Sequence, residues 1–65
     1  MFNYVVSITD LHSGTVNQYW IVAKSELDAA RQVLKTDFED LSSMQDYVSS
    51  SDMYIGIFDT TAYTV

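Results

Sequence analysis

The chain must fold without any covalent or metal cross-link. Its 65 residues contain no Cys and one His, which excludes disulfides and a zinc site built from Cys or paired His. A domain of this length buries only about 60% of its unfolded surface, so its stability depends on dense packing or on association with another chain. Because 48% of the residues are apolar, a packed core can form, and we expect residues 1–65 to be a single domain.

Alternating apolar residues predict two strands in the first third of the chain. Over 2–9 one side of the strand is apolar at period two, through Phe2, Tyr4, Val6 and Ile8. A turn should follow at 10–14, where Gly14 can adopt a positive φ. The second predicted strand, 15–23, has two apolar faces in its second half, because Tyr19, Ile21 and Ala23 alternate with Val16, Trp20 and Val22.

A helix is predicted to begin after residue 25. Ser25 and Asp28 form a variant of the capping box, in which the Ser25 hydroxyl accepts from backbone N–H groups of the first turn. A stripe within about 80° of a helical wheel extends this helix to residue 41. Its members are Leu27, Ala30, Leu34, Phe38 and Leu41. Acids at helical spacing, Asp28 for Arg31 and Glu39 for Lys35, should neutralise its two cations.

The remaining patterns complete the order of elements. Ser42 or Ser43 is expected to cap a short second helical turn with Met44, Tyr47 and Val48. A third strand is predicted over 53–58, with Met53, Ile55 and Ile57 on one face and Tyr54 and Phe58 on the other. Residues 60–65 form either a fourth strand or a frayed end. This order indicates an α+β fold of two layers, in which an antiparallel sheet carries the main helix on one face.

The other face of this sheet is also predicted to be apolar. It would carry Val5, Trp20, Val22 and one side of the third strand, which is more apolar surface than a small monomer normally exposes. We therefore expect these three residues to mark an oligomer face, used in a homodimer or against another protein.

Negative charge is concentrated in the second half of the chain. The formal net charge is −6, and residues 1–35 contribute nothing to it because three acids balance three bases there. The charged residues after Lys35 are all acidic: Asp37, Glu39, Asp40, Asp46, Asp52 and Asp59. A field of one sign steers oppositely charged partners and repels nucleic acid and anionic membranes. The sequence therefore predicts a binding protein with its contact surface in this half.

No combination of residue types predicts catalysis. His12 is the only candidate general base, and Asp10, His12 and Ser13 stand too close together in one turn for a line of proton transfer. The acids of 37–40 lack the spacing and central Gly of a calcium loop, and at the end of a helix they would oppose its dipole. Phosphate-binding glycine loops are missing too, so no enzymatic activity, metal or cofactor is expected.

Aromatic residues stand beside several of the acids, and carboxylates next to aromatic rings can present negative charge where a basic groove normally receives phosphates. The predicted partner-binding residues are Asp37, Glu39, Asp40, Asp46, Tyr47, Asp52, Tyr54 and Asp59. Duplex DNA carries one negative charge per roughly 1.7 Å, so these acids replace only a fraction of an equal length of duplex. The expected target is a short basic cleft of a nucleic-acid-binding protein, and direct binding of nucleic acid is not expected because only three bases are present.

In type, the chain resembles the small acidic proteins of phages and other mobile elements that block host defence, including anti-CRISPR and anti-restriction inhibitors. The resemblance rests on the short length, the absence of Cys and Pro, the strand-strand-helix-strand order and the acids from Asp37 to Asp59 with Tyr47 and Tyr54 between them. The segment 20–30 is also similar to the strand-into-helix passage of many small mobile-element domains. The resemblance implies inhibition by occupation of a nucleic-acid-binding or partner-binding surface.

Three alternatives remain open from the sequence. The acids could simply keep a structural homodimer soluble, the chain could be an adaptor subunit of a larger assembly, or an acidic surface could reflect a halophilic source. The start of the chain does not show a basic region followed by a long apolar run, and its longest apolar stretch, 19–23, is far shorter than the roughly 20 residues of a membrane span. A cytoplasmic location is expected, in the host cell if a phage encodes the protein.

Overall fold

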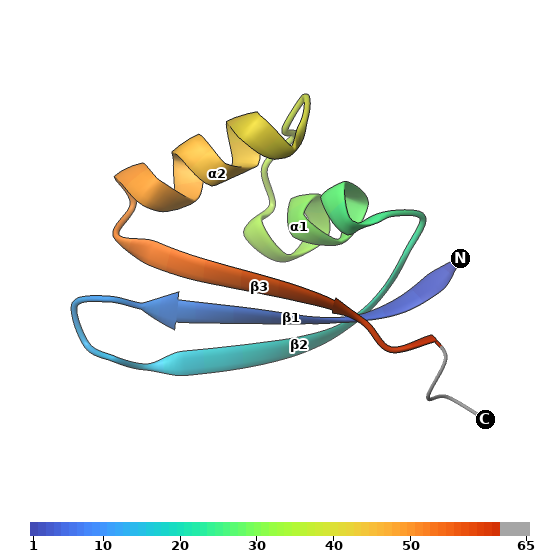
Figure 1. Cartoon of the computed structure of the whole chain (residues 1–65), viewed down its shortest axis with the longest axis horizontal. Coiled ribbons are helices and arrows are strands. Elements are labelled where there is room, and N and C mark those ends of the chain that lie inside the picture. Colours follow the sequence, from blue (N-terminus) through green and yellow to red (C-terminus); the bar gives the residue numbers. More distant parts are fainter. Residues whose placement is uncertain (62–65) are drawn as a thin grey trace.

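A computed structural model describes residues 1–61 of the chain. Its elements follow the order β1 (Phe2–Asp10), β2 (Val16–Ala23), α1 (Glu26–Leu34), α2 (Leu41–Ser50) and β3 (Met53–Asp59). The strands form one antiparallel sheet in the order β2-β1-β3, and both helices cover the same face of it (Figure 1). The molecule measures 37 × 26 × 15 Å along its principal axes. The predicted α+β fold is confirmed, whereas the suggested fourth strand falls mainly on 62–65, outside the described residues.

The core lies between the sheet and the helices, and the central strand β1 supplies its middle. Val6 is fully buried, and its neighbours in register are Tyr19 on β2 and Ile57 on β3. The buried side chains are Tyr4, Val6, Ala23, Ala29, Ala30, Phe38, Met44, Val48 and Ile55. The period-two pattern therefore identified the buried side of β1 correctly, since Tyr4 and Val6 are buried.

Helix α1 begins as predicted but ends earlier. Ser25 is the N-cap, and its hydroxyl accepts a hydrogen bond of 3.1 Å from the backbone N–H of Asp28. The helix ends at Leu34 because Lys35 adopts the left-handed conformation, with φ 53° and ψ 41°, which stops the helical hydrogen-bond pattern. The prediction that one helix continues to residue 41 is wrong. Phe38 nevertheless reaches the core, from the loop between the two helices.

Helix α2 is longer than predicted and has a different cap. Asp40 is its N-cap and accepts a hydrogen bond of 2.8 Å from the backbone N–H of Ser43, so the prediction of Ser42 or Ser43 as the cap is wrong. Asp40 therefore stands at the start of a helix, where a negative charge is favourable, and it does not oppose the dipole of a preceding helix end. Met44 and Val48 point from α2 into the core.

The predicted pairing of the α1 cations is also corrected. The guanidinium Nε of Arg31 donates to the backbone oxygen of Phe38 at 2.8 Å and lies 3.8 Å from Asp37 Oδ1. Asp28 instead accepts from the Lys24 backbone N–H and from the Gln32 amide. Because the helix ends before Glu39, the spacing that would have paired Glu39 with Lys35 no longer applies. These two contacts of Arg31 hold the loop between the helices against α1.

The turn between β1 and β2 uses the residues that predicted it. Gly14 has φ +73°, and Asp10 Oδ1 accepts hydrogen bonds from the backbone N–H groups of His12, at 2.9 Å, and Ser13, at 3.4 Å. These hydrogen bonds lower the pKa of Asp10, because they stabilise its charged form. Neither helix of the described chain is long and apolar enough to cross a membrane.

Candidate interaction surfaces

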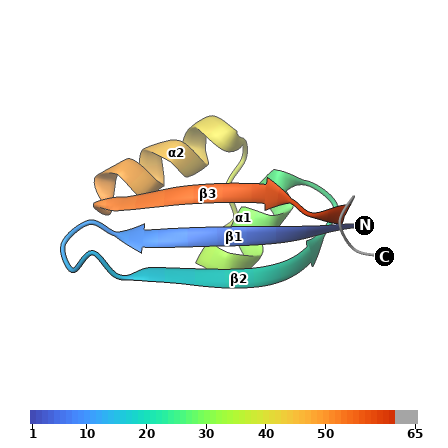
Figure 2. The ribbon, with the colours of Figure 1, turned by 60° about the horizontal axis from the view of Figure 1, so that its bottom comes forward.

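One face of the sheet has no helix over it, and Figure 2 shows this face turned toward the viewer. Alternation along the strands assigns eleven residues, one of them a glycine, to this face, which is here called the open face. They are Asn3, Val5, Ser7 and Thr9 of β1, Val16, Gln18, Trp20 and Val22 of β2, and Tyr54, Gly56 and Phe58 of β3. The three residues predicted as an oligomer face, Val5, Trp20 and Val22, all belong to this set.

The strand register arranges these side chains in rows across the sheet. Trp20 and Phe58 flank Val5 from opposite sides in one row, and Val16 and Tyr54 flank Thr9 in another. Between these rows lies a row of smaller and polar residues: Gln18, Ser7 and Gly56. Directly paired side chains on a sheet stand about 5 Å apart, so each outer row is a continuous surface.

The large side chains of the open face are unusually exposed. Trp20 is 73% exposed, Tyr54 67% and Phe58 58%, while Val16 and Val22 are each more than half exposed. The ring of Phe58 lies over Gly56, since a Cβ at that glycine would stand only 3.0 Å from the ring. Exposed aromatic groups of this size on one flat surface are typical of sites where proteins contact one another.

The open face carries none of the chain's twelve charged residues (three basic, nine acidic). The three basic residues lie outside the open face. Arg31 lies on α1, and Lys24 and Lys35 lie near the start and the end of that helix. Aromatic sheet surfaces that stack nucleic-acid bases combine their rings with a positively charged groove, and this one has no positive charge. Its composition therefore favours a protein as the partner.

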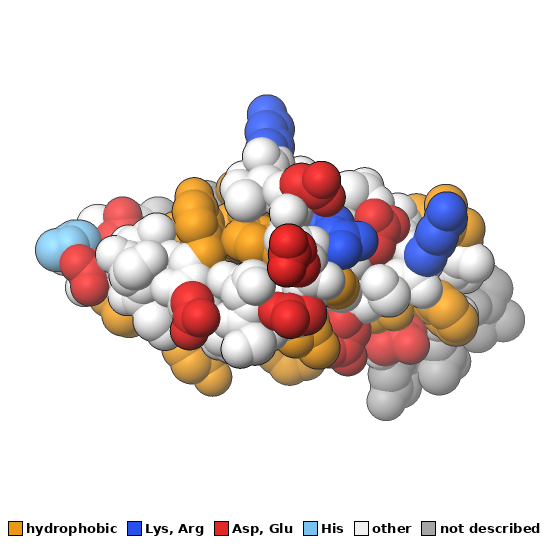
Figure 3. All heavy atoms as spheres, turned by 90° about the horizontal axis from the view of Figure 1, so that it is seen from above, with side chains coloured by type: hydrophobic (Ala, Val, Ile, Leu, Met, Phe, Trp, Pro, Cys, Tyr) orange, Lys and Arg blue, Asp and Glu red, His pale blue; other side chains and the backbone are white. Residues whose placement is uncertain are grey.

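The helix side of the molecule is charged (Figure 3). Asp37 and Glu39 lie in the loop between α1 and α2, Asp40 caps α2, and Asp46 and Tyr47 lie on α2 itself. These five of the predicted partner-binding residues are therefore close in sequence and lie within one loop and one helix. Lys and Arg are missing from 36–50, and Arg31 is the cation that approaches this segment, at 3.8 Å from Asp37.

Two of these acids already have roles in the fold. Asp37 pairs with Arg31, and Asp40 holds the first turn of α2. The hydrogen bond from the Ser43 backbone lowers the pKa of Asp40, because it stabilises the carboxylate. Tyr47 packs edge-on against Phe38, with ring centroids 5.4 Å apart. Glu39 and Asp46 are exposed and have no ion-pair partner in the described structure, so they are the acids most available to a partner.

The other three predicted partner-binding residues lie elsewhere. Asp52 stands at the start of β3, where its Oδ2 lies 2.9 Å from His12 Nε2 in the β1–β2 turn. Asp59 ends β3 in register with Tyr4, and burial, Asp59 and Glu26 together raise the pKa of the Tyr4 phenol. Tyr54 projects from the open face. The eight predicted residues thus do not form a single surface.

The structure determines which side of the third strand belongs to the open face, which the sequence patterns had left undecided. Phe58 and Tyr54 had been placed on one side of the third strand, but only the strand order brings that strand beside β1 and sets Phe58 next to Val5. Val16 had been placed on the same side of its strand as Trp20 and Val22, whereas Ser7 and Gly56 had not been singled out. Charge could not have separated the two faces, because the three strands carry charged residues only at the last positions of β1 and β3, Asp10 and Asp59.

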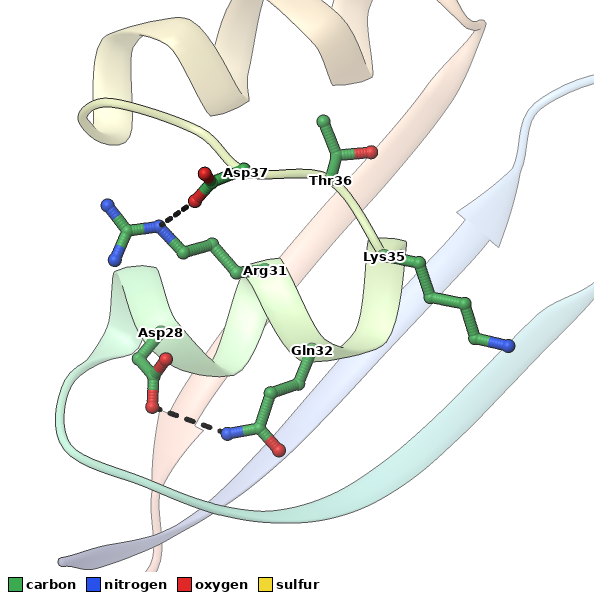
Figure 4. A pocket seen from close by; sticks show the side chains of 6 residues that line it. All are labelled: Asp28, Arg31, Gln32, Lys35, Thr36 and Asp37. Atoms are coloured by element: carbon green, nitrogen blue, oxygen red, sulfur yellow. Dashed lines mark hydrogen bonds and ion pairs between the residues drawn. The ribbon is translucent and has the colours of Figure 1, made fainter.

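A shallow depression of about 390 Å³ lies beside α1, lined by Asp28, Arg31, Gln32, Lys35, Thr36 and Asp37. Its polar groups are mostly paired with one another: Figure 4 shows Arg31 turned toward Asp37 and Gln32 toward Asp28, while Lys35 extends away. Elsewhere in residues 1–61, no group of three or more His, Cys, Asp or Glu side chains is placed to hold a metal ion.

Comparison of the chain with protein-family models, with curated proteins and with solved structures finds no match.

Proposed function

We propose that this protein is a small non-catalytic binding protein that contacts another protein chain through the open face of its sheet. The observation that carries this proposal is the row in which Trp20 and Phe58 flank Val5, with both rings more than half exposed and no charged side chain on the face. Trp and other aromatic groups dominate the binding energy of protein interfaces, and charged residues are depleted at their centres. The proposal corresponds to a structural or adaptor role.

The acidic helix side fits this role as well. A protein with an exposed aromatic face is prone to unspecific association, and a net charge of −6 on the remaining surface counteracts it. The acids also repel nucleic acid, which disfavours nucleic-acid binding at the open face and leaves proteins as its partners. We further propose that the protein is cytoplasmic and is encoded by a phage or another mobile element.

The proposal is tested by affinity capture with three forms of the tagged chain: wild type, Trp20→Ser and Leu41→Ser. Leu41 is also an exposed apolar residue, at 45%, but it lies at the start of α2 on the helix side, so it serves as the matched control. A partner that is captured by wild type and Leu41→Ser and lost with Trp20→Ser supports the proposal. A partner retained equally by all three forms contradicts it.

A second candidate function is inhibition of a host defence protein through the acidic helix side, as in anti-CRISPR or anti-restriction proteins that occupy a basic nucleic-acid-binding surface. It is favoured by one observation: Asp37, Glu39, Asp40 and Asp46 lie within one loop and one helix that contain no Lys or Arg. Both functions can coexist, because the two surfaces lie on opposite sides of the molecule.

This candidate is tested by reversing the two acids that have no role in the fold. Glu39→Lys with Asp46→Lys should abolish capture of a basic partner while the melting temperature stays near that of wild type. Reversal of Asp40 is unsuitable, because it would also remove the cap of α2. The control, Glu39→Gln with Asp46→Asn, removes charge without reversing it and should weaken binding less. Capture that survives the double reversal and is insensitive to salt would rule out the acidic surface.

A further inference from the structure

We propose that the partner of the open face is a second copy of this chain, bound face to face in a two-fold symmetric dimer. This inference deepens the proposed function and rests on it, since it names the occupant of the same surface. Three features of the face favour a second copy: its lack of charge, the symmetry of its rows and its area.

The distribution of charge allows two copies to approach in spite of their net charge of −6 each. The open face contributes no charge, and the acids of the loop and α2 lie beyond the helix layer on the opposite side. Face-to-face association therefore keeps these acids of the two copies far apart, where salt screens their repulsion. A partner that binds through charged side chains would find no opposite charge on this face. The open face of a second copy carries no charge and therefore needs no opposite charge.

The rows of the open face are self-complementary under a two-fold axis, which pairs each residue i with a residue j in both directions. An axis parallel to β1 sets Trp20 of one copy against Phe58 of the other and Val16 against Tyr54. An axis across the strands sets Trp20 against Val16 and Phe58 against Tyr54. Both arrangements follow from the register and match apolar groups with apolar groups.

The middle row of the open face also faces its counterpart in the second copy. Because Ser7 lies at the centre of β1 on the open face, either axis brings Ser7 of one copy against Ser7 of the other. Ser7 and Gly56 of this row are small, and the ring of Phe58 already lies over Gly56, so the rings of the outer rows can cover this row when two sheets pack about 10 Å apart. The position of Ser7 on the axis gives the inference a geometric test.

The area of the face is sufficient for a dimer. At about 200 Å² for an aromatic side chain, the exposed fractions of Trp20, Tyr54 and Phe58, 73%, 67% and 58%, amount to about 400 Å² of ring surface. The exposed parts of Val16 and Val22 raise the apolar area to about 500 Å². Since about 60% of a typical interface is apolar, this corresponds to about 800 Å² per copy, the size of a standard protein interface.

The dimer is tested by sedimentation of the wild-type chain from about 1 μM to about 1 mM. We expect a concentration-dependent shift from monomer to dimer, and a melting temperature that rises with concentration. Trp20→Ser should weaken the dimer by about 30-fold or more, as for a residue at the centre of an interface, whereas the helix-side control Leu41→Ser should not change it. A chain that stays monomeric throughout this range overturns the inference.

The single Trp of the chain gives an independent readout. In the monomer, Trp20 is 73% exposed, so acrylamide should quench its fluorescence efficiently. On dimerisation, the emission should shift to shorter wavelength and the quenching should decrease, at the same concentrations at which sedimentation detects the dimer. An unchanged emission in a sample that sedimentation shows to be dimeric means that the dimer uses another surface, such as the free edge of β2, and overturns the face-to-face arrangement.

The symmetry is tested with single thiols, which are straightforward to introduce because the chain has no Cys. Ser7→Cys should be joined efficiently to a second copy by a short bismaleimide, and Ser49→Cys, exposed on α2, should not. Equal cross-linking of both variants contradicts the two-fold arrangement.

Failure of this inference can be distinguished from failure of the proposed function. If the chain is monomeric but another protein is captured in a manner that depends on Trp20, the second copy is excluded and the binding role of the open face stands. If Trp20→Ser changes neither self-association nor capture, both proposals fail.

Discussion

The carboxylate of Asp40 accepts a hydrogen bond of 2.8 Å from the backbone N–H of Ser43, and this contact fixes the first turn of α2. The helix in turn places Met44 and Val48 against the sheet. A single exposed acid therefore links a local capping interaction to the packing of the core. The other acids of 37–46 have no comparable contact with the backbone of α2.

Substitution of Asp40 by Ala is expected to lower the melting temperature by about 5 °C, because a backbone N–H of the first turn then loses its partner. Asp40→Asn should retain most of the wild-type stability, since an Asn side chain also accepts this hydrogen bond. Thermal unfolding followed by circular dichroism measures both variants. Equal losses in Ala and Asn would mean that the charge of Asp40, and not its capping, is what matters.

The same residue predicts how stability depends on pH. The pKa of Asp40 is lowered by the hydrogen bond from Ser43, relative to the ordinary value of 3.8. A lowered pKa in the folded state means that the carboxylate stabilises the fold above pH 3.8 and that this contribution disappears as the pH falls through the folded-state value.

Melting curves between pH 7 and about pH 2.5 measure this effect as the difference between wild type and Asp40→Asn. Wild type should lose more stability than Asp40→Asn below about pH 4, because the Asn amide does not titrate there. Asp10, whose pKa is lowered by the backbone N–H groups of His12 and Ser13, is present in both forms and cancels in the difference. Parallel curves would contradict the assignment of the lowered pKa to Asp40.

Met44 gives a prediction for the core. Its side chain is 2% exposed beneath α2, so Met44→Ala leaves a cavity and should reduce the free energy of unfolding by about 2–5 kcal/mol. The neighbouring Gln45 is exposed, and Gln45→Ala should change the stability by less than about 0.5 kcal/mol. Urea unfolding at low temperature measures both.

A domain of this size has a total stability of only about 3–10 kcal/mol, so Met44→Ala could be unfolded altogether. Met44→Leu, which conserves volume, provides the second comparison and should lose less than about 1.5 kcal/mol. If Met44→Ala and Gln45→Ala were equally stable, α2 would not be packed on the sheet as described.

Sequence patterns were sufficient for the strands because their signal is local. The alternation of Tyr4 and Val6 with Val5 and Ser7 depends only on the geometry of an extended chain, and it identified the buried side of β1. Prediction of the complete open face also required the strand order. Phe58 joins Trp20 in one surface only because β1 lies between their strands, and strand order is set by long-range packing that no local pattern encodes.

The helical region shows why a periodic pattern can mislead. Leu27, Ala30 and Leu34 lie on α1, and Phe38 continues the same period although it belongs to a loop. The pattern recorded burial correctly, since Phe38 is 5% exposed, but burial through a loop and burial through a helix look alike at that spacing. At the end of α1, Lys35 stands in the place of the Gly that usually marks the end of a helix.

The backbone of Lys35 is strained at the end of α1. Lys35 ends α1 with φ 53°, a left-handed conformation that costs a residue with a Cβ about 1 kcal/mol and that Gly adopts freely. Lys35→Gly should therefore raise the free energy of unfolding by about 0.5–1 kcal/mol, since part of the gain is offset by the greater freedom of Gly in the unfolded chain. Lys35→Ala removes the same charge but keeps the Cβ, so it should show no such gain.

Urea unfolding of the two variants separates the backbone effect from the charge effect. A Gly variant no more stable than the Ala variant would show that this helix end is not strained, and a shorter α1 would then need another cause.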